Sequence, residues 1–316
     1  MKKEAIVLLN MGGPNNLEEV EPFLSNMFSD KNILTVKSDL LRAIIGTIIT
    51  FARAEKSQDI YRQIGGKSPI VALTKELVKK LQARVGEDVV VDFAMRYAPP
   101  FADEVIERIN KEEVNKIYLI PLYPQFSTTT TKSSLEDFEE HYHNGGANAI
   151  LVETKHFFEN SSYNKAILQR IKEKIGEDKC EDFDLLFSAH GLPKSIIKAG
   201  DVYEKHIIRH VEIIKNMLEE EGLNFNKTHL AYQSKVGPME WLKPSLEEKL
   251  MSMENKKVII FPIAFTIDNS ETDYELEIQY REVAHELGFE EYRVCRCPND
   301  SDFFVDALVE IYEKMQ

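Results

Sequence analysis

Short apolar runs alternate along the chain with longer segments in which apolar residues recur every three or four positions. The short runs are continuous, as in strands buried on both faces of a parallel sheet, and the longer segments have the period of helices. Strands are predicted at residues 5–10, 89–94, 116–122 and 149–152, and again at 184–188, 229–232, 257–265 and 291–294. Helices are predicted at residues 74–85, 102–110, 163–175 and 206–221.

The order of these elements predicts an α/β fold with two similar halves. Each half has about four strands in the same order, which indicates an internal doubling into domains at residues 1–165 and 166–316. In an open parallel sheet of order 2-1-3-4, ligands bind at the carboxyl ends of strands 1 and 3. The loops at those ends read MGGPNN, YPQFSTTTTKSS, AHGLP and TIDNSETDYE. We expect them to line two facing crevices that could hold a large, flat ligand.

Composition and charge argue against several classes of protein. The 316 residues include 39 basic and 53 acidic side chains, and the net charge of −14 favours cationic or neutral partners over nucleic acid. Three cysteines are too few for a disulfide framework or for a four-thiolate iron–sulfur cluster. No secretory leader and no run of 18 apolar residues is evident, so we expect a cytoplasmic location.

A histidine and a row of polar side chains are the candidates for chemistry. His190 ends the run LLFSAH and precedes Gly-Leu-Pro, which would hold it rigidly at the mouth of a crevice. Glu271, Glu275 and Gln279 recur every four residues, so on a helix they would share one face in steps of about 6 Å. Such a row beside a histidine could pass a divalent cation and carry protons away. The alternative is a core histidine beside a solvated acidic helix start, which the helix dipole favours.

An apolar stripe at helical period lies in the segment from Leu40 to Phe51. Its members are Leu40, Leu41, Ile44, Ile45, Ile48 and Ile49, and the basic residues in or beside it are Lys37, Arg42 and Arg53. A stripe of this kind is either the buried face of a core helix or an apolar lip that contacts a membrane surface. We favour the lip, because the rest of the segment carries little charge.

Seven motifs, taken together, resemble those of the ferrochelatase family and occur in the order found there. They are LNMGGP, YRQIGGKSPI, FAMRYAPP, YPQFSTTTTKSS, LFSAHGLP, YQSKVGPMEWLKP and IAFTIDNSETDYELEIQY, and they extend from about residue 4 to beyond residue 310. The resemblance implies a chelatase fold of two Rossmann-like domains with a porphyrin cleft between them. It implies a lyase of heme biosynthesis that inserts Fe²⁺ into protoporphyrin IX, gives protoheme, and needs no cofactor beyond the substrate iron.

The resemblance also implies roles for individual residues. It makes His190 and Glu271 the catalytic pair and iron ligands, and it places Glu275 on an acidic path. The porphyrin contacts that it implies are Met11, Tyr61, Arg96, Tyr97, Ser127, Tyr232 and Trp241. Met11 resembles the protoporphyrin branch, because the coproporphyrin branch has a tyrosine there. Two positions depart from the family pattern: Asn269 replaces a common histidine, and Gln279 replaces an acid.

These residues suggest a mechanism and leave two alternatives open. A neutral His190 would accept a pyrrole proton, and Glu271 would stabilise the imidazolium that forms. A chelatase that loads cobalt or nickel into another tetrapyrrole would share the architecture. A non-catalytic tetrapyrrole carrier is the second alternative, and Asn269 keeps it open.

Overall fold

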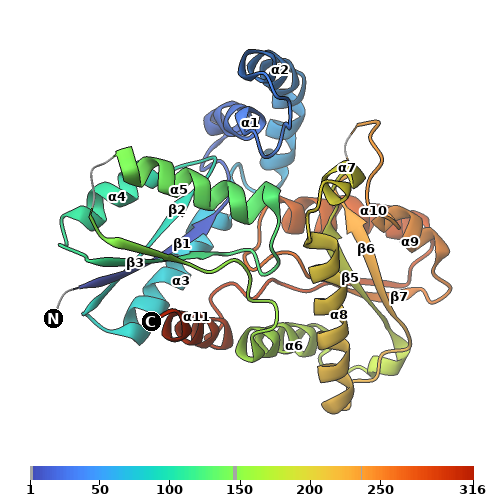
Figure 1. The fold of residues 1–316 in the computed structure, drawn as a ribbon. Coiled ribbons are helices and arrows are strands. Elements are labelled where there is room, and N and C mark those ends of the chain that lie inside the picture. Colours follow the sequence, from blue (N-terminus) through green and yellow to red (C-terminus); the bar gives the residue numbers. More distant parts are fainter. Residues whose placement is uncertain (1–2, 145–147, 236) are drawn as a thin grey trace. The chain divides into compact units, whose positions relative to one another are not determined.

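The chain folds into two units, shown in Figure 1. The structure is a computed structural model that describes residues 3–144, 148–235 and 237–316. Unit 1 comprises Met1–Phe157 together with Val305–Gln316, and unit 2 comprises Phe158–Phe304. The sequence placed the boundary at residue 165 and assigned the whole C-terminus to the second half. The last helix instead packs on the first sheet, where the Tyr312 ring meets Tyr118 at 4.9 Å.

Unit 1 is built on a parallel sheet in the order β2-β1-β3-β4. Its strands are β1 (Glu4–Asn10), β2 (Val89–Met95), β3 (Lys116–Pro121) and β4 (Ile150–Glu153). The helices α4 (Ala102–Asn110) and α5 (Ser133–Asn144) bury apolar side chains on one face. The helices α3 (Ile70–Val85) and α11 (Asp302–Met315) cover the other face (Figure 1). Apolar strands buried on both sides explain this layering, because neither face of the sheet is left to water.

Unit 2 repeats the arrangement in the order β6-β5-β7-β8. Its strands are β5 (Asp184–His190), β6 (Thr228–Gln233), β7 (Lys257–Pro262) and β8 (Glu291–Val294). The helices α9 (Leu246–Ser252) and α10 (Tyr280–Glu286) pack on one face, and α6 (Ser161–Ile175) and α8 (Tyr203–Glu220) lie on the other. The predicted strand order is therefore confirmed in both halves. The predicted strand at 257–265 is too long, because the chain turns after Pro262, whose carbonyl accepts the Phe265 N–H.

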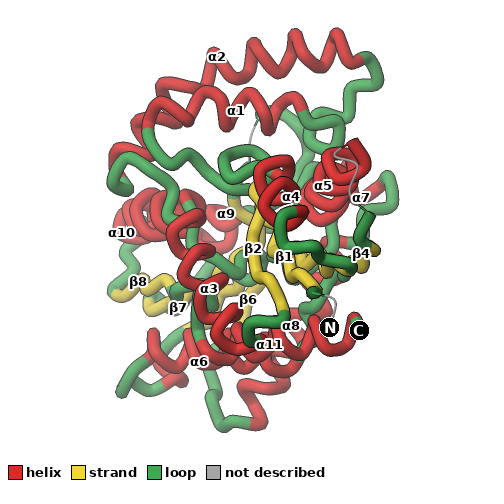
Figure 2. The backbone as a smooth tube through the Cα atoms, turned by 90° about the vertical axis from the view of Figure 1, so that its left-hand side faces the viewer, coloured by secondary structure: helices red, strands yellow, loops and turns green. Residues whose placement is uncertain are grey.

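The helices α1 (Val20–Ser29) and α2 (Asp39–Gln63) lie side by side in unit 1 (Figures 1 and 2). Gly46 permits the close approach, because a Cβ atom there would stand 2.9 Å from the Phe28 carbonyl oxygen. Of the predicted apolar stripe, Ile49 packs toward α1 and Ile45 is half-buried, whereas Leu40 and Ile48 are exposed. The stripe therefore has both a core side and an exposed side. None of the described helices is both long and apolar enough to cross a membrane.

Short helical turns make up the rest of the helical structure in the described ranges. They are the 3₁₀ turns η1 (Leu17–Glu19) and η3 (Cys180–Asp182), the π-helices η2 (Thr128–Lys132) and η4 (Glu271–Gln279), and α7 (Lys194–Lys198). In a π-helix the hydrogen bonds run between residues five apart, and such segments are rare and frequent at functional sites. Both π-helices follow the third strand of a sheet, in the loops that the sequence analysis singled out.

Candidate active site

His190 and Glu271 contact each other directly in unit 2. His190 is the last residue of β5, the central strand between β6 and β7, and Glu271 is the first residue of η4. The His190 Nδ1 atom lies 2.7 Å from the Glu271 Oε2 atom. The Phe265 ring meets the imidazole edge-on at 6.5 Å between centroids. Two segments 81 residues apart in sequence thus bring together the pair that the sequence singled out.

The environment of His190 changes its basicity in opposing directions. Burial by itself lowers the pKa of the imidazole, but the charge and hydrogen bond of Glu271, together with the charge of Glu275, outweigh it, so the pKa is raised above its ordinary value. The tautomer that donates from Nδ1 to Glu271 leaves the Nε2 lone pair to accept a proton. The pair can therefore take up a proton and stabilise the positive charge that results.

Glu275 lies close to this pair, with a hydrogen-bond partner that the sequence analysis missed. Its two oxygens accept the Ser234 backbone N–H at 2.8 Å and the Ser234 hydroxyl at 2.5 Å. The same hydroxyl lies 3.1 Å from Glu271 Oε2, and the Gln233 amide donates to Glu275 at 3.3 Å. Burial, and then the charge of Glu271, raises the pKa of Glu275, so this carboxyl holds a proton to higher pH than an ordinary glutamate. Gln279, the last member of the predicted row, is exposed.

The loop that carries Glu271 is fixed by Asp268 and Asn269. The Asp268 carboxylate is buried and accepts the Cys297 N–H at 3.0 Å and the Asn299 side-chain amide at 2.7 Å. The Asn269 Oδ1 atom accepts the Glu271 N–H at 2.8 Å, and its amide donates to the Ile267 carbonyl at 3.1 Å. Asn269 therefore holds the first turn of η4 by a side-chain hydrogen bond, as Asx turns do.

Two of the predicted porphyrin contacts lie near His190 in unit 2. Tyr232 is buried in β6, and it pairs across the sheet with Ala189, the neighbour of His190. Trp241 forms a bridge with Pro193, and its ring would stand 3.4 Å from a Cβ atom at Gly191. The loop after β6 is thus packed against the turn that follows His190.

Arg96 and Tyr97 lie at the end of β2 in unit 1 and share a buried acid. The Tyr97 hydroxyl donates to Asp30 at 2.7 Å, and the Arg96 guanidinium lies 3.5 Å from the same carboxylate and 3.1 Å from Asp137. Ser133 also hydrogen-bonds to Asp30. Burial raises the pKa of Asp137, although the positive charge of Arg96 opposes the rise. The acids orient Arg96, and neither acid was identified from the sequence.

The other predicted contacts in unit 1 are mostly buried. Tyr61 belongs to the apolar cluster between α1 and α2 and the end of β2, and Met11 packs against that cluster. Ser127 is buried and caps the start of η2, with its hydroxyl accepting the Thr129 N–H at 3.2 Å. The structure thus brings Met11, Tyr61 and Tyr97 together, and Ser127 is a cap at the start of a π-helix.

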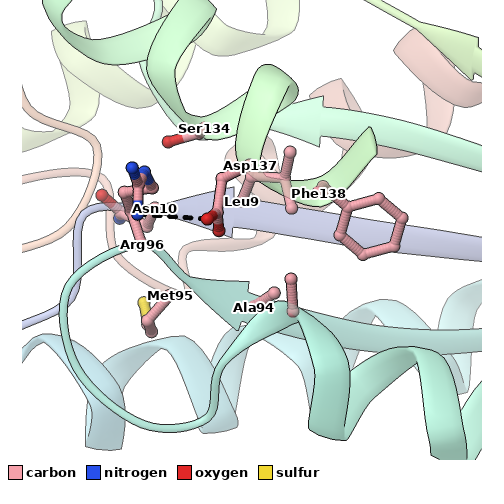
Figure 3. A pocket seen from close by; sticks show the side chains of 9 residues that line it. Leu9, Asn10, Ala94, Met95, Arg96, Ser134, Asp137 and Phe138 are labelled. Carbon is pink, nitrogen blue, oxygen red and sulfur yellow. Dashed lines mark ion pairs between the residues drawn. The ribbon is translucent and has the colours of Figure 1, made fainter. Parts of the chain in front are cut away.

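A small pocket opens at the carboxyl ends of β1 and β2 (Figure 3). Arg96 and Asp137 form an ion pair there, and Asn10, Ser134 and Phe138 are among the other lining residues. Its accessible volume of about 10 Å³ is roughly what one water molecule needs. This pocket is therefore too small to enclose a tetrapyrrole. In the described parts of the chain, no group of three or more His, Cys, Asp or Glu side chains is placed to hold a metal ion.

Comparison with known proteins agrees with the motifs. The model of the family described as ferrochelatase matches residues 3–316. A protein of Sulfurimonas denitrificans named ferrochelatase is 70% identical over 316 residues, and the match covers 100% of this chain and 100% of that protein. A Nitratiruptor protein of the same name is 51% identical over 312 residues, which are 99% of this chain and 100% of that protein.

Solved structures agree on the fold. The sirohydrochlorin chelatase SirB from Bacillus subtilis subspecies spizizenii, in complex with cobalt, has a TM-score of 0.58. The match covers 99% of this chain and 95% of that one, at 10% sequence identity. SirB from Bacillus subtilis with Fe³⁺ has a TM-score of 0.57 at 14% identity, over the same shares of the two chains. At such low identity the likeness extends to the fold alone.

Proposed function

The chain belongs to the ferrochelatase family and inserts Fe²⁺ into protoporphyrin in heme biosynthesis. We propose that three of its residues, His190, Glu271 and Glu275, carry out the proton chemistry of that reaction. The observation that supports these roles is the 2.7 Å contact between His190 Nδ1 and Glu271 Oε2 at the end of the central strand. Iron and porphyrin are both substrates, and the porphyrin nitrogens become the final ligands of the metal.

The reaction requires two pyrrole N–H protons to leave as the ferrous ion enters the macrocycle. The Nε2 atom of neutral His190 accepts a pyrrole proton, and the charge that forms on the imidazole is stabilised by Glu271. Glu275, whose pKa is raised by burial and by Glu271, is suited to take protons onward. His190 and Glu271 are also the residues that we propose to contact iron before it reaches the pyrrole nitrogens.

We assign the porphyrin contacts to the seven residues that the family resemblance implies. The contacts within each unit support this assignment, since Arg96 is oriented by two carboxylates and could meet an acidic propionate. Met11 at the end of β1 supports protoporphyrin, rather than coproporphyrin, as the porphyrin. The residues of this chain supply the proton acceptors, and we propose that no further cofactor takes part.

Substitution of His190 by alanine tests the catalytic assignment. Anaerobic mixing of the purified variant with protoporphyrin and ferrous iron, followed by absorbance, should show a loss of metallation of at least ~10²-fold, the usual contribution of a general base. Porphyrin binding, measured by fluorescence quenching, should stay within about threefold, because the seven side chains assigned to hold the macrocycle are all retained. His285→Ala, at an exposed histidine of the same unit, is the matched control. Near-normal turnover by the His190 variant would refute the assignment.

We also propose a cytoplasmic protein that contacts a membrane surface through the exposed side of α2. Leu40, Ile48 and Phe51 are 74%, 63% and 85% exposed, and Leu41 and Ile44 are each 49% exposed. If these five side chains were half inserted, they would contribute about 4–7 kcal/mol before the cost of association. Arg42 donates to Asp39 and to two backbone carbonyls, so it is held within the protein and contributes little to lipid binding.

Liposome co-sedimentation tests the membrane proposal with two double variants of the same helix. Ile44→Ser with Ile48→Ser changes the exposed side and should reduce binding to neutral and anionic vesicles, with thermal stability retained. Ile45→Ser with Ile49→Ser changes the side toward α1 and should lower the thermal midpoint instead. If the first pair unfolds the protein, or binds vesicles as wild type does, the exposed side is not a membrane contact.

A further inference from the structure

Ser234 adopts a backbone conformation that serine rarely takes. It follows β6 directly, and its φ angle is +65°, in the left-handed region that favours glycine and, less strongly, asparagine. Side chains other than glycine persist in this region when the surrounding structure holds them there, and such residues cluster at functional sites. The conformation therefore calls for an account of what the serine contacts.

The contacts of Ser234 all lead to the two carboxylates of η4. Its N–H and its hydroxyl donate to the two oxygens of Glu275, at 2.8 Å and 2.5 Å. The hydroxyl oxygen also lies 3.1 Å from Glu271 Oε2, the same atom that meets His190. The left-handed turn is what aims both donors of one residue at η4. A single side chain thus connects the acid beside the histidine to the next acid along the helix.

We propose that Ser234 is a positioning residue that holds Glu271 and Glu275 side by side, so that Glu271 stays aligned on His190. Two carboxylates that approach the same hydroxyl repel each other, and a donor placed between them offsets the repulsion. Without the hydroxyl, we expect Glu275 to turn away and Glu271 to lose its fixed orientation. The inference rests on the proposed function of the His190–Glu271 pair, and it adds the residue that aligns this pair.

Two substitutions separate the hydroxyl from the backbone conformation. Ser234→Gly removes the hydroxyl and relieves the left-handed conformation, whereas Ser234→Ala removes the hydroxyl and leaves the strain in place. Both keep the N–H that Glu275 accepts. Ser234→Gly should stay close to the wild type in heat stability, because relief of the left-handed conformation offsets the lost hydrogen bond, and this guards against loss of activity through unfolding. Lys235→Ala, at the exposed neighbouring residue, is the matched control.

The expected result is a loss of kcat of about tenfold in both variants, equal to a transition-state effect of roughly 1.4 kcal/mol, with the KM for porphyrin unchanged. The nitrogen resonance of His190 Nδ1, recorded without substrate on protein labelled at histidine, should shift in both variants and not in Lys235→Ala. An unshifted Nδ1 resonance in Ser234→Gly, whatever its kcat, would overturn the proposal. A shifted resonance with an unchanged kcat would show that Ser234 aligns the pair but that the pair is not catalytic, and this outcome overturns the proposed function instead.

Discussion

Exchange of Asp268 and Asn299 should restore a hydrogen-bond pattern that either single substitution breaks. In the native loop, Asp268 accepts from the Asn299 amide at 2.7 Å and from the Cys297 N–H at 3.0 Å. The Asp268 N–H donates in turn to Asn299 Oδ1 at 2.9 Å. In the exchanged pair the amide and the carboxylate trade places, and each bond keeps one donor and one acceptor. The pair therefore tests what holds the loop that leads to Glu271.

The size of the effect follows from burial, because both side chains are at most 5% exposed. Asp268→Asn places an amide donor opposite the donor of Asn299, and a lost hydrogen bond to a charged acceptor costs about 1.5–3 kcal/mol. Asn299→Asp places two buried carboxylates against each other, at about 3–5 kcal/mol. The double variant should recover most of both losses, with a coupling free energy of at least ~2 kcal/mol.

Urea unfolding followed by tryptophan fluorescence measures these differences in the relevant part of the chain. Trp241 is the single tryptophan, and it belongs to unit 2, as both substituted residues do. Asp268 also lies 3.3 Å from the Arg296 side chain, which is 61% exposed. Arg296→Gln is therefore the control, and it should cost less than either single variant, because it leaves the hydrogen bonds of the buried Asp268 carboxylate in place. If the double variant is as unstable as the sum of the single variants, the paired hydrogen bonds are not what holds the loop.

Three further measurements follow from the site. Glu271→Gln should lower the pKa of His190, because the raising influence of the carboxylate is lost and burial remains; an NMR titration that shows no fall would contradict this. Asn269→Asp should keep the hydrogen bond to the Glu271 N–H and most of the turnover, whereas the kcat of Asn269→Ala should fall several-fold. Equal kcat values in these two variants would exclude the capping role. A thiol reagent should modify only Cys180 quickly in the folded protein, since it is partly exposed and the two other cysteines are buried; fast reaction at a second thiol would contradict the burial.

The strand order could be predicted because a buried parallel strand carries its signal in a few residues. The strand β1 is apolar from Ala5 to Leu9, and the turn that follows it contains two glycines and a proline. Such a run predicts both the type of the element and its place in the order of strands. The first and last residues of the helices were harder to predict. The helix α3 begins at Ile70, directly after Pro69, whereas its apolar pattern was recognised only from residue 74. A proline before a helix fixes the start by its backbone geometry, which a count of apolar positions does not register.

The catalytic candidates could be predicted from their residue types, but their hydrogen-bond and ion-pair partners could not. A histidine at a strand end and glutamates four apart are visible in a sequence, whereas Asp30 and Ser234 are common residues in ordinary loops. The role of Ser234 depends on its φ angle and on its neighbours. A glycine in a sequence suggests a left-handed conformation, whereas a serine does not. Only the folded chain brings it to Glu275, 41 positions away.

The π-helix at η4 shows why a correct pairing can follow from an incorrect geometry. Their spacing predicts that Glu271 and Glu275 share one face of an α-helix, in which residues four apart are rotated by about 40° around the axis. The chain instead forms bonds between residues five apart, as the Tyr280 N–H does to the Glu275 carbonyl. Positions four apart still lie near one face when the turn is wider, so the two acids meet the same serine. The hydrogen bonds around this turn come from Asn269 and from Ser234, which lies 41 positions from Glu275. A spacing of four along the sequence registers none of these contacts, so the sequence predicted the pairing of the acids but not the helix on which they lie.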